Sequence, residues 1–152
     1  MTTDAPRTMT GGCQCGRIRY RVEVADADAY LCHCAMCRRA TGGVSVAFKQ
    51  VRQSAIAWET QPPDRYRSSP IAERPFCSAC GTPLGFRYLD SEKMDLTVGS
   101  FDEPDWFRPT MNFSQETMLP AWSDTSHLPG QRLDSYAPIA DRWSQALGKQ
   151  PG

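Results

Sequence analysis

The stretch GGCQCG, residues 11–16, places two cysteines one residue apart between glycines. On an extended strand two such residues point the same way about 6.6 Å apart, a separation that does not suit a disulfide. A tetrahedral zinc ion with bonds of about 2.3 Å needs its sulfur ligands roughly 3.8 Å apart, and glycine lets the backbone bend around it. Cys13 and Cys15 therefore predict half of a metal site, with two buried small side chains as the alternative.

The other cysteines also occur in groups. The chain has seven cysteines, an odd number that excludes complete pairing within one chain. The turn CSAC contributes Cys77 and Cys80, and a turn of this kind commonly wraps a metal with two thiolates. Together with the first pair it predicts a closed four-thiolate zinc site that stabilises the fold. A redox CxxC motif is the alternative, but it belongs at a helix start in a βαβ unit, and a proline-led strand is expected here.

The stretch LCHCAMCRR contains the remaining three cysteines, Cys32, Cys34 and Cys37. We expect the first two to share a strand face and the third to return on a turn, so that three thiolates meet at one ion. An ion with three protein ligands keeps an open fourth position, which is typical of a reactive zinc site. His33 lies between two ligands and should point away from them, so a packed imidazole is expected rather than a fourth ligand. His127 lies in a polar loop and is expected to be solvated.

The length and the charge balance narrow the class of protein. A chain of 152 residues is long enough for one hydrophobic core, so one domain is expected. Its 17 basic and 17 acidic residues cancel, and the overall charge draws it neither to nucleic acid nor to an anionic membrane. The polar first residues do not resemble a secretion signal, and no segment approaches the roughly 20 apolar residues of a membrane span. We therefore expect a soluble, cytoplasmic protein.

Alternating apolar residues indicate a fold built mainly of strands. In GRIRYRVEV, residues 16–24, one face carries Ile18, Tyr20, Val22 and Val24. Three more strands are expected within residues 42–48, 83–89 and 93–99, and the frequent prolines and glycines suit β-turns. A short helix is expected at residues 138–148, where apolar side chains recur every four residues after a proline.

The order GGCQCG, CHCAMCRRATG, RPFCSACGTPL, LTVGSFDEP and LPAW resembles the glutathione-dependent formaldehyde-activating (GFA) family, which includes CENP-V-related proteins. The resemblance covers about residues 11–130. It implies an all-β, zinc-stapled β-tent fold of the Mss-four-like superfamily, with short helical turns and a short C-terminal helix. The corresponding domains would be a flexible N-terminus at residues 1–10, a zinc domain at 11–137, and a helix and tail at 138–152.

The resemblance also implies two zinc ions per chain. The structural zinc would be held by Cys13, Cys15, Cys77 and Cys80, and the catalytic zinc by Cys32, Cys34 and Cys37. A zinc ion bound by three thiolates is a poor Lewis acid for activating water, but it suits a fourth sulfur ligand and the reactive thiolate form of a substrate. We therefore expect a carbon–sulfur lyase, similar to S-hydroxymethylglutathione synthase, whose small-molecule partners are a thiol and an aldehyde such as glutathione and formaldehyde.

Glutathione carries two carboxylates, which guanidinium groups recognise well. Arg38, Arg39 and Arg74 follow or precede the cysteine motifs and are the candidate substrate-binding residues, with solvated surface charge as the alternative. Five aromatic residues could line a pocket or belong to the core, namely Phe48, Phe76, Phe86, Trp106 and Trp122. The sequence does not identify the proton donor.

Other functions use the same residues. A thiol carrier would bind glutathione at the second zinc without turnover, and in an interaction module both metals would be structural. A methionine-sulfoxide reductase would need a redox cysteine outside the metal sites, and all seven cysteines are assigned to those sites. The oligomeric state is left open.

Overall fold

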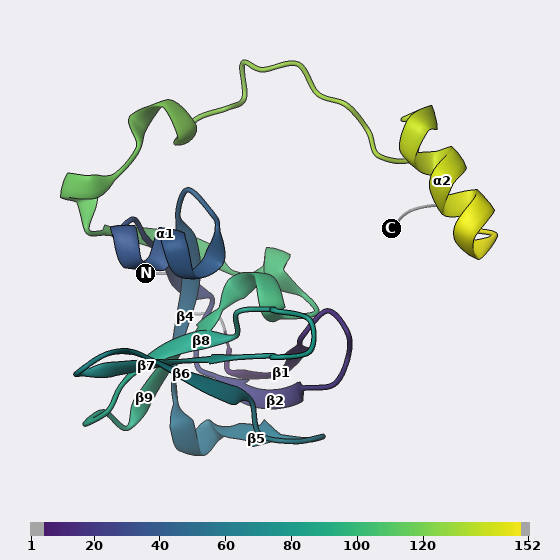
Figure 1. Cartoon of the computed structure of the whole chain (residues 1–152). Helices are drawn as coiled ribbons and strands as arrows, with labels where there is room; N and C mark the ends of the chain where they lie inside the picture. Colours follow the sequence, from purple (N-terminus) through teal and green to yellow (C-terminus); the bar gives the residue numbers. More distant parts are fainter. Residues whose placement is uncertain (1–4, 150–152) are drawn as a thin grey trace. The chain divides into compact units, whose positions relative to one another are not determined.

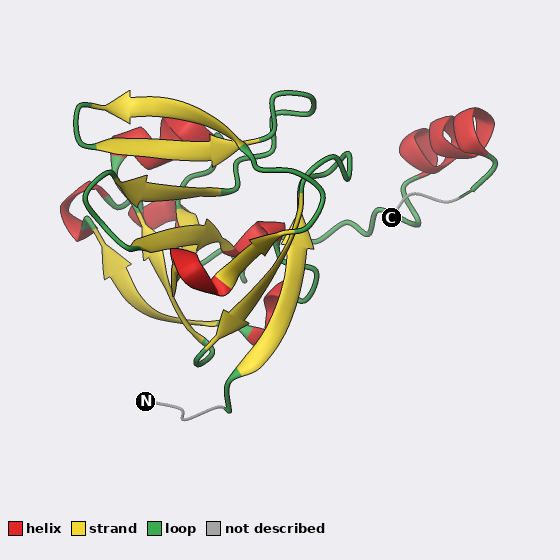
Figure 2. Cartoon of the chain, turned by 90° about the horizontal axis from the view of Figure 1, so that it is seen from below, coloured by secondary structure: helices red, strands yellow, loops and turns green. Residues whose placement is uncertain are grey.

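The computed structural model describes residues 5–149, and the chain divides into two compact units, residues 1–119 and 120–152. Among the described residues, strands dominate the first unit (Figures 1 and 2). The strands are β1 Arg7–Gly12, β2 Arg19–Val24, β3 Asp28–Cys32, β4 Val46–Arg52, β5 Ile56–Trp58, β6 Asp64–Ser69, β7 Ala72–Phe76, β8 Gly85–Tyr88, β9 Lys93–Thr97 and β10 Arg108–Phe113. Residues 5–149 also form the α-helices α1 Ala35–Thr41 and α2 Ala137–Leu147, and several 3-10 turns join the strands.

Within the described part of the chain, the strands form two open sheets. The smaller sheet has the order β1-β2-β5, and the larger has the order β10-β3-β4-β9-β8-β7-β6. Neighbouring strands are antiparallel except for β10, which runs parallel to β3. The expected strand-rich fold with short helices is therefore confirmed. β1 begins at Arg7, inside the segment that the sequence analysis assigns to a flexible N-terminus, and residues 1–4 of that segment lie outside the described residues.

β2 shows why the alternating pattern forms a strand. Its apolar residues and the preceding Ile18 are almost completely buried, with exposed fractions of 0–1%. β2 begins three residues later than the pattern, because residues 13–18 form a loop in which the Cys13 amide donates to the Ile18 carbonyl at 3.0 Å. The buried Tyr20 hydroxyl pairs with the Ser100 hydroxyl at 2.7 Å, so its polar end is satisfied inside the core.

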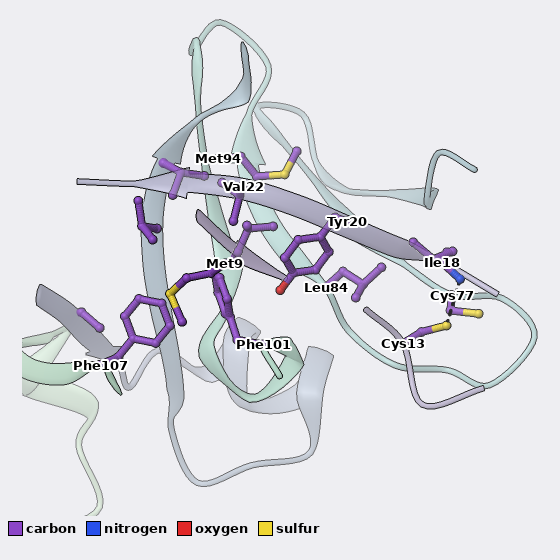
Figure 3. Packing of buried hydrophobic residues seen from close by; sticks show 14 residues of the cluster. Met9, Cys13, Ile18, Tyr20, Val22, Cys77, Leu84, Met94, Phe101 and Phe107 are labelled. Carbon is purple, nitrogen blue, oxygen red and sulfur yellow. Dashed lines mark hydrogen bonds between the residues drawn. The ribbon is translucent and has the colours of Figure 1, made fainter. Parts of the chain in front are cut away.

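The main core combines the small sheet with one face of the large sheet. Figure 3 shows Met9 and Tyr20 from the small sheet packed with Met94 from β9 and with Phe101. Cys13 and Cys77 belong to the same cluster and lie beside Ile18 at one end of it. The first cysteine group is therefore part of the packing that joins the two sheets.

The opposite face of the large sheet has a different character. In β9, Met94 and Leu96 belong to the main core, so Asp95 and Thr97 point to the other face. The register of the sheet places Gln50 of β4 and Phe86 of β8 on either side of Asp95. A second cluster of Cys32, Cys37, Val46 and Phe48 also packs on this face. Gln50, Phe86, Asp95 and the two cysteines of the second cluster thus lie on the face away from the main core.

The second unit contains α2, which confirms the helix expected at residues 138–148. A proline lies in its first turn, and Gly148 ends it in the left-handed conformation with φ 67°. The side chains of Ile139, Trp143 and Leu147 are all exposed by more than a third. At 11 residues α2 is far too short to cross a bilayer, and none of the described helices has the length and apolar character that a membrane span requires.

Candidate metal centres and the pocket beside them

The first cysteine group brings four sulfur atoms together. The Sγ atoms of Cys13, Cys15, Cys77 and Cys80 all lie within 4.8 Å of one another. The Cys13–Cys15 separation is 3.5 Å, and the Cys15–Cys77 separation is 3.8 Å. Sulfur ligands of a tetrahedral zinc ion are roughly 3.8 Å apart, so the donor set and its spacing fit a closed zinc site.

Two short loops position these sulfurs. A glycine in the left-handed conformation follows each cysteine pair, Gly16 with φ 81° and Gly81 with φ 80°. The Gly16 amide donates to the Cys13 carbonyl at 3.1 Å, and the Gly81 amide donates to the Cys77 carbonyl at 2.7 Å. Because other residues rarely adopt a positive φ, the glycines let both loops turn back tightly enough for the sulfurs to meet.

Hydrogen-bond donors surround the first sulfur cluster. The Ile18 amide donates to Cys13 Sγ at 3.2 Å, and Arg17 Nη1 lies 3.7 Å from Cys77 Sγ. Side-chain and backbone hydrogen bonds from Thr82 lower the pKa of Cys80 to about 5. Cys15 differs: the Arg17 backbone acts to lower its pKa, but the neighbouring thiol of Cys13 and burial raise it to about 11. Four thiolates this close repel one another, so full ionisation of the cluster requires a cation at its centre.

The second cysteine group lies where β3 leads into α1. Its three Sγ atoms also lie within 4.8 Å of one another, and the Cys32–Cys34 separation is 3.6 Å. The prediction that Cys32 and Cys34 share a strand face is wrong, because β3 ends at Cys32. Cys34 is instead the N-cap of α1, and its sulfur accepts a hydrogen bond from the Cys37 amide at 3.3 Å. Cys37 returns on the first turn of this helix rather than on a loop turn. Burial raises the pKa of Cys32 to about 12, so this thiol too needs a nearby cation to ionise.

The two histidines lie outside both sulfur clusters. His33 is buried, and its Nε2 atom lies 2.8 Å from Asn112 Oδ1 on the neighbouring strand β10. This is the packed imidazole that the sequence analysis expects. His127 is exposed in the second unit. Among residues 5–149, no histidine or carboxylate joins the three-sulfur group within the same 4.8 Å limit.

A pocket of about 440 Å³ opens beside the three-sulfur group. All three cysteines of the group line it. The other lining residues are mainly aromatic or apolar, with a few polar side chains between them: Tyr30, Met36, Phe48, Gln50, Arg74, Phe86, Tyr88, Asp95, Met111, Phe113 and Ser114. A substrate in this pocket would therefore contact the sulfur cluster and the aromatic walls at the same time.

The three candidate arginines have different surroundings. Arg74 lines the pocket and is 8% exposed, with Nη2 3.4 Å from Cys37 Sγ and its guanidinium carbon 4.9 Å from the centre of the Phe86 ring. Arg38 Nη1 donates to two backbone carbonyls at 2.7 Å, those of His33 and Thr117. Arg39 is exposed on α1. Of the three, Arg74 is the one that lines the pocket.

The five candidate aromatic residues lie in different parts of the structure. Phe48 and Phe86 line the pocket, and Phe76 lines an adjoining cavity of about 310 Å³ that shares Phe48 and Arg74 with it. Trp106 packs against the main core, and Trp122 is exposed in the second unit.

The predicted site residues do not include several polar residues of the pocket, among them Tyr30 and Asp95. The available signals were their positions on strands. Tyr30 precedes Cys32 by two residues and so shares its face, and Asp95 alternates with two core residues.

Comparison with known proteins agrees with this geometry. The chain is 32% identical over 82 residues to an uncharacterized lyase of Schizosaccharomyces pombe, an alignment that covers 54% of this chain and 59% of the yeast protein. A crystal structure of a Rhodobacter sphaeroides protein has the same fold, with a TM-score of 0.54 and 24% identity over 68% of this chain and 99% of that one. The family model of the glutathione-dependent formaldehyde-activating enzyme matches residues 8–116, which include both cysteine groups and every residue that lines the pocket. The chain therefore belongs to the glutathione-dependent formaldehyde-activating enzyme family.

Proposed function

We propose that this protein is a zinc-dependent carbon–sulfur lyase that makes or breaks adducts between a small thiol and an aldehyde. The observation that carries the proposal is the three-sulfur group in the wall of the pocket, which would leave one zinc position facing the substrate. Family membership and the lyase name of the yeast relative support the reaction class. Cys13, Cys15, Cys77 and Cys80 would hold a second, structural zinc ion.

The ligand set determines the chemistry. When bound to Cys32, Cys34 and Cys37, zinc would supply a soft, electron-rich position that favours a substrate thiol in its reactive, deprotonated form. Three thiolates and one Zn²⁺ ion carry a net charge of −1. Arg74, which donates a hydrogen bond to Cys37, would offset this negative charge. The aromatic walls would exclude water and hold the carbonyl carbon against the sulfur, and this proximity accounts for much of the catalysis that such an addition needs.

The lining of the pocket also favours a class of substrate. Glutathione would bring two carboxylates, but Arg38 is engaged by backbone carbonyls and Arg74 by Cys37. Tyr30, Phe86 and Phe113 instead offer aromatic surface. We therefore propose an adduct with an apolar or aromatic group on at least one side, and we expect such thiols or aldehydes to react faster than glutathione and formaldehyde.

The variant Cys34→Ser tests the proposed site. Serine is a good N-cap, so it should keep the start of α1 while removing one sulfur ligand. We expect this variant to keep its fold and lose one of two zinc ions, as measured by elemental analysis and thermal unfolding. Exchange NMR on thiol–aldehyde mixtures should show faster adduct exchange with the wild type and only the uncatalysed rate with the variant.

Ala35→Ser is the matched control, since it changes the adjacent exposed residue of α1 and leaves all three sulfurs in place. It should behave as the wild type in both assays. Thiol binding without faster exchange by the wild type would favour the carrier function. Equal behaviour of the wild type and Cys34→Ser in binding and in exchange would contradict the lyase and favour a structural module.

A further inference from the structure

The pocket contains a buried carboxyl group. Asp95 is 5% exposed and lines the pocket together with the three sulfurs. Its neighbours Met94 and Leu96 point into the main core, which fixes the Asp95 side chain on the pocket face of the sheet. The central strand β9 therefore holds an acid among aromatic walls, where burial of its charged form costs free energy.

The partners of Asp95 come from several strands. Gln50 Nε2 on β4 donates to Asp95 Oδ1 at 3.4 Å, and the Tyr30 hydroxyl on β3 hydrogen-bonds to the same carboxyl. Burial raises the pKa of Asp95 above its usual range, although both hydrogen bonds and the charge of Lys93 act in the opposite direction. Arg74 on β7, which lines the same pocket, donates to Cys37. Asp95 thus holds its proton more strongly than an ordinary aspartate.

We propose that Asp95 is the catalytic proton-transfer residue of this pocket, an inference that rests on the proposed function. In the addition, the sulfur lone pair forms the carbon–sulfur bond, the carbonyl π electrons move to oxygen, and that oxygen takes the proton of Asp95. The carboxylate then recovers a proton from the next thiol as that thiol ionises. In the reverse reaction, Asp95 takes the hydroxyl proton of the adduct while the carbon–sulfur bond breaks and its electron pair leaves with sulfur.

Asp95→Asn tests this role with little change in shape. The amide oxygen can still accept hydrogen bonds from Tyr30 and Gln50, but the side chain cannot transfer a proton at neutral pH. We expect the variant to keep two zinc ions and the thiol affinity of the wild type, while the catalysed part of adduct exchange falls by about 10²–10⁴-fold. The zinc content, thiol binding and exchange rate are measured on the same zinc-loaded samples.

Asp90→Asn is the control, because Asp90 is exposed in the turn between β8 and β9 and does not line the pocket. It should match the wild type in all three measurements. A ¹³C NMR titration of the wild type supplies a readout independent of turnover, and the Asp95 carboxyl should titrate above the usual value of about 3.9.

The possible outcomes separate this inference from the proposed function. If the wild type accelerates exchange and Asp95→Asn does so equally well, Asp95 is not the proton-transfer residue although the lyase proposal stands. Loss of zinc or of thiol affinity in Asp95→Asn would also overturn the inference, because the carboxyl would then serve the site in another way. No acceleration by the wild type would overturn both.

Discussion

At the scale of single residues, charge is controlled by a few well-placed donors. Thr82 favours the thiolate of Cys80, and Arg74 favours that of Cys37. Asp95 is the opposite case, because its surroundings favour the neutral acid. Within the pocket, Arg74 thus acts toward an anionic Cys37 sulfur against the effect of burial, while the surroundings of Asp95 favour a protonated carboxyl. Addition of a thiol to a carbonyl uses both charge states.

The raised pKa of Asp95 predicts a dependence of stability on pH. Since its pKa is higher in the folded chain than in the unfolded chain, the neutral carboxyl contributes fully below about pH 4. That contribution is lost as the pH rises through the folded-state pKa. Asparagine does not ionise, so Asp95→Asn should be more stable than the wild type at neutral pH, and its advantage should grow with pH until the wild-type carboxyl is fully charged.

The measurement is the free energy of unfolding in urea from about pH 4, where an unfolded aspartate titrates, to about pH 8.5, taken as the difference between the two zinc-loaded proteins at each pH. Loss of zinc at the acidic end affects both proteins and largely cancels in this difference. An advantage that stays constant or shrinks as the pH rises from about 4 would contradict a raised pKa for Asp95 in the folded chain.

The sequence predicts some of these residues better than others. The spacing of the cysteines is enough to predict both sulfur clusters, because a tetrahedral ion imposes a local geometry on CxC and CxxC turns. The motifs do not identify Tyr30 and Asp95 as pocket residues. Their role depends on which face of the large sheet covers the main core, and that follows from the pairing of strands far apart in the sequence.

At the scale of elements, close approach of two strands decides the shape of the pocket. Gly85 of β8 lies against β9, and a Cβ atom at this position would come within 2.5 Å of the Asp95 carbonyl oxygen. Backbone cannot move aside as a flexible side chain can. We therefore expect Gly85→Ala to lower the free energy of unfolding by about 2–3 kcal/mol and to weaken thiol binding, because β8 carries Phe86 and β9 carries Asp95.

Gly99→Ala is the matched control for this prediction. A Cβ atom at Gly99 would have no heavy atom within 4 Å, and its φ lies outside the left-handed region. Urea unfolding of this variant should agree with the wild type to within about 0.5 kcal/mol. Equal stability of the two alanine variants would show that β8 and β9 can separate without cost.

Strands with an alternating sequence pattern can be predicted locally, whereas strands formed by pairing with a distant segment cannot. Alternation predicts β2 and β9, because each buries one face completely. β6 and β10 have no such pattern, since most of their residues are exposed or only partly buried. Both lie at edges of the large sheet, where pairing with a neighbouring strand rather than burial makes them strands. The helix α1 was missed because its cysteine-led first turn resembles a loop in sequence.

At the scale of the whole molecule, the two faces of the large sheet have different roles. One face completes the main core with the small sheet, and the other carries the pocket. The first sulfur cluster joins the small sheet to the large one, because the sulfurs of Cys15 and Cys77 meet although the two residues are 62 positions apart in the sequence. The family match ends at residue 116 and the first compact unit ends at Leu119, so we propose that the zinc domain lies within these limits and that α2 is outside it.

The first sulfur cluster predicts how the whole fold depends on metal. Cys80 is partly exposed, so its side chain contributes little to the core, but it supplies one of the four sulfurs. If this group binds zinc, Cys80→Ala should leave the chain largely unfolded even with added zinc, because the binding free energy of a structural zinc ion, of the order of 10 kcal/mol, is coupled to folding. Circular dichroism and thermal unfolding of the purified variant measure this directly. Ala79→Ser, a change at the exposed neighbour within the same turn, should melt with the wild type, and a Cys80→Ala protein that did the same would exclude a folding-critical zinc at this site.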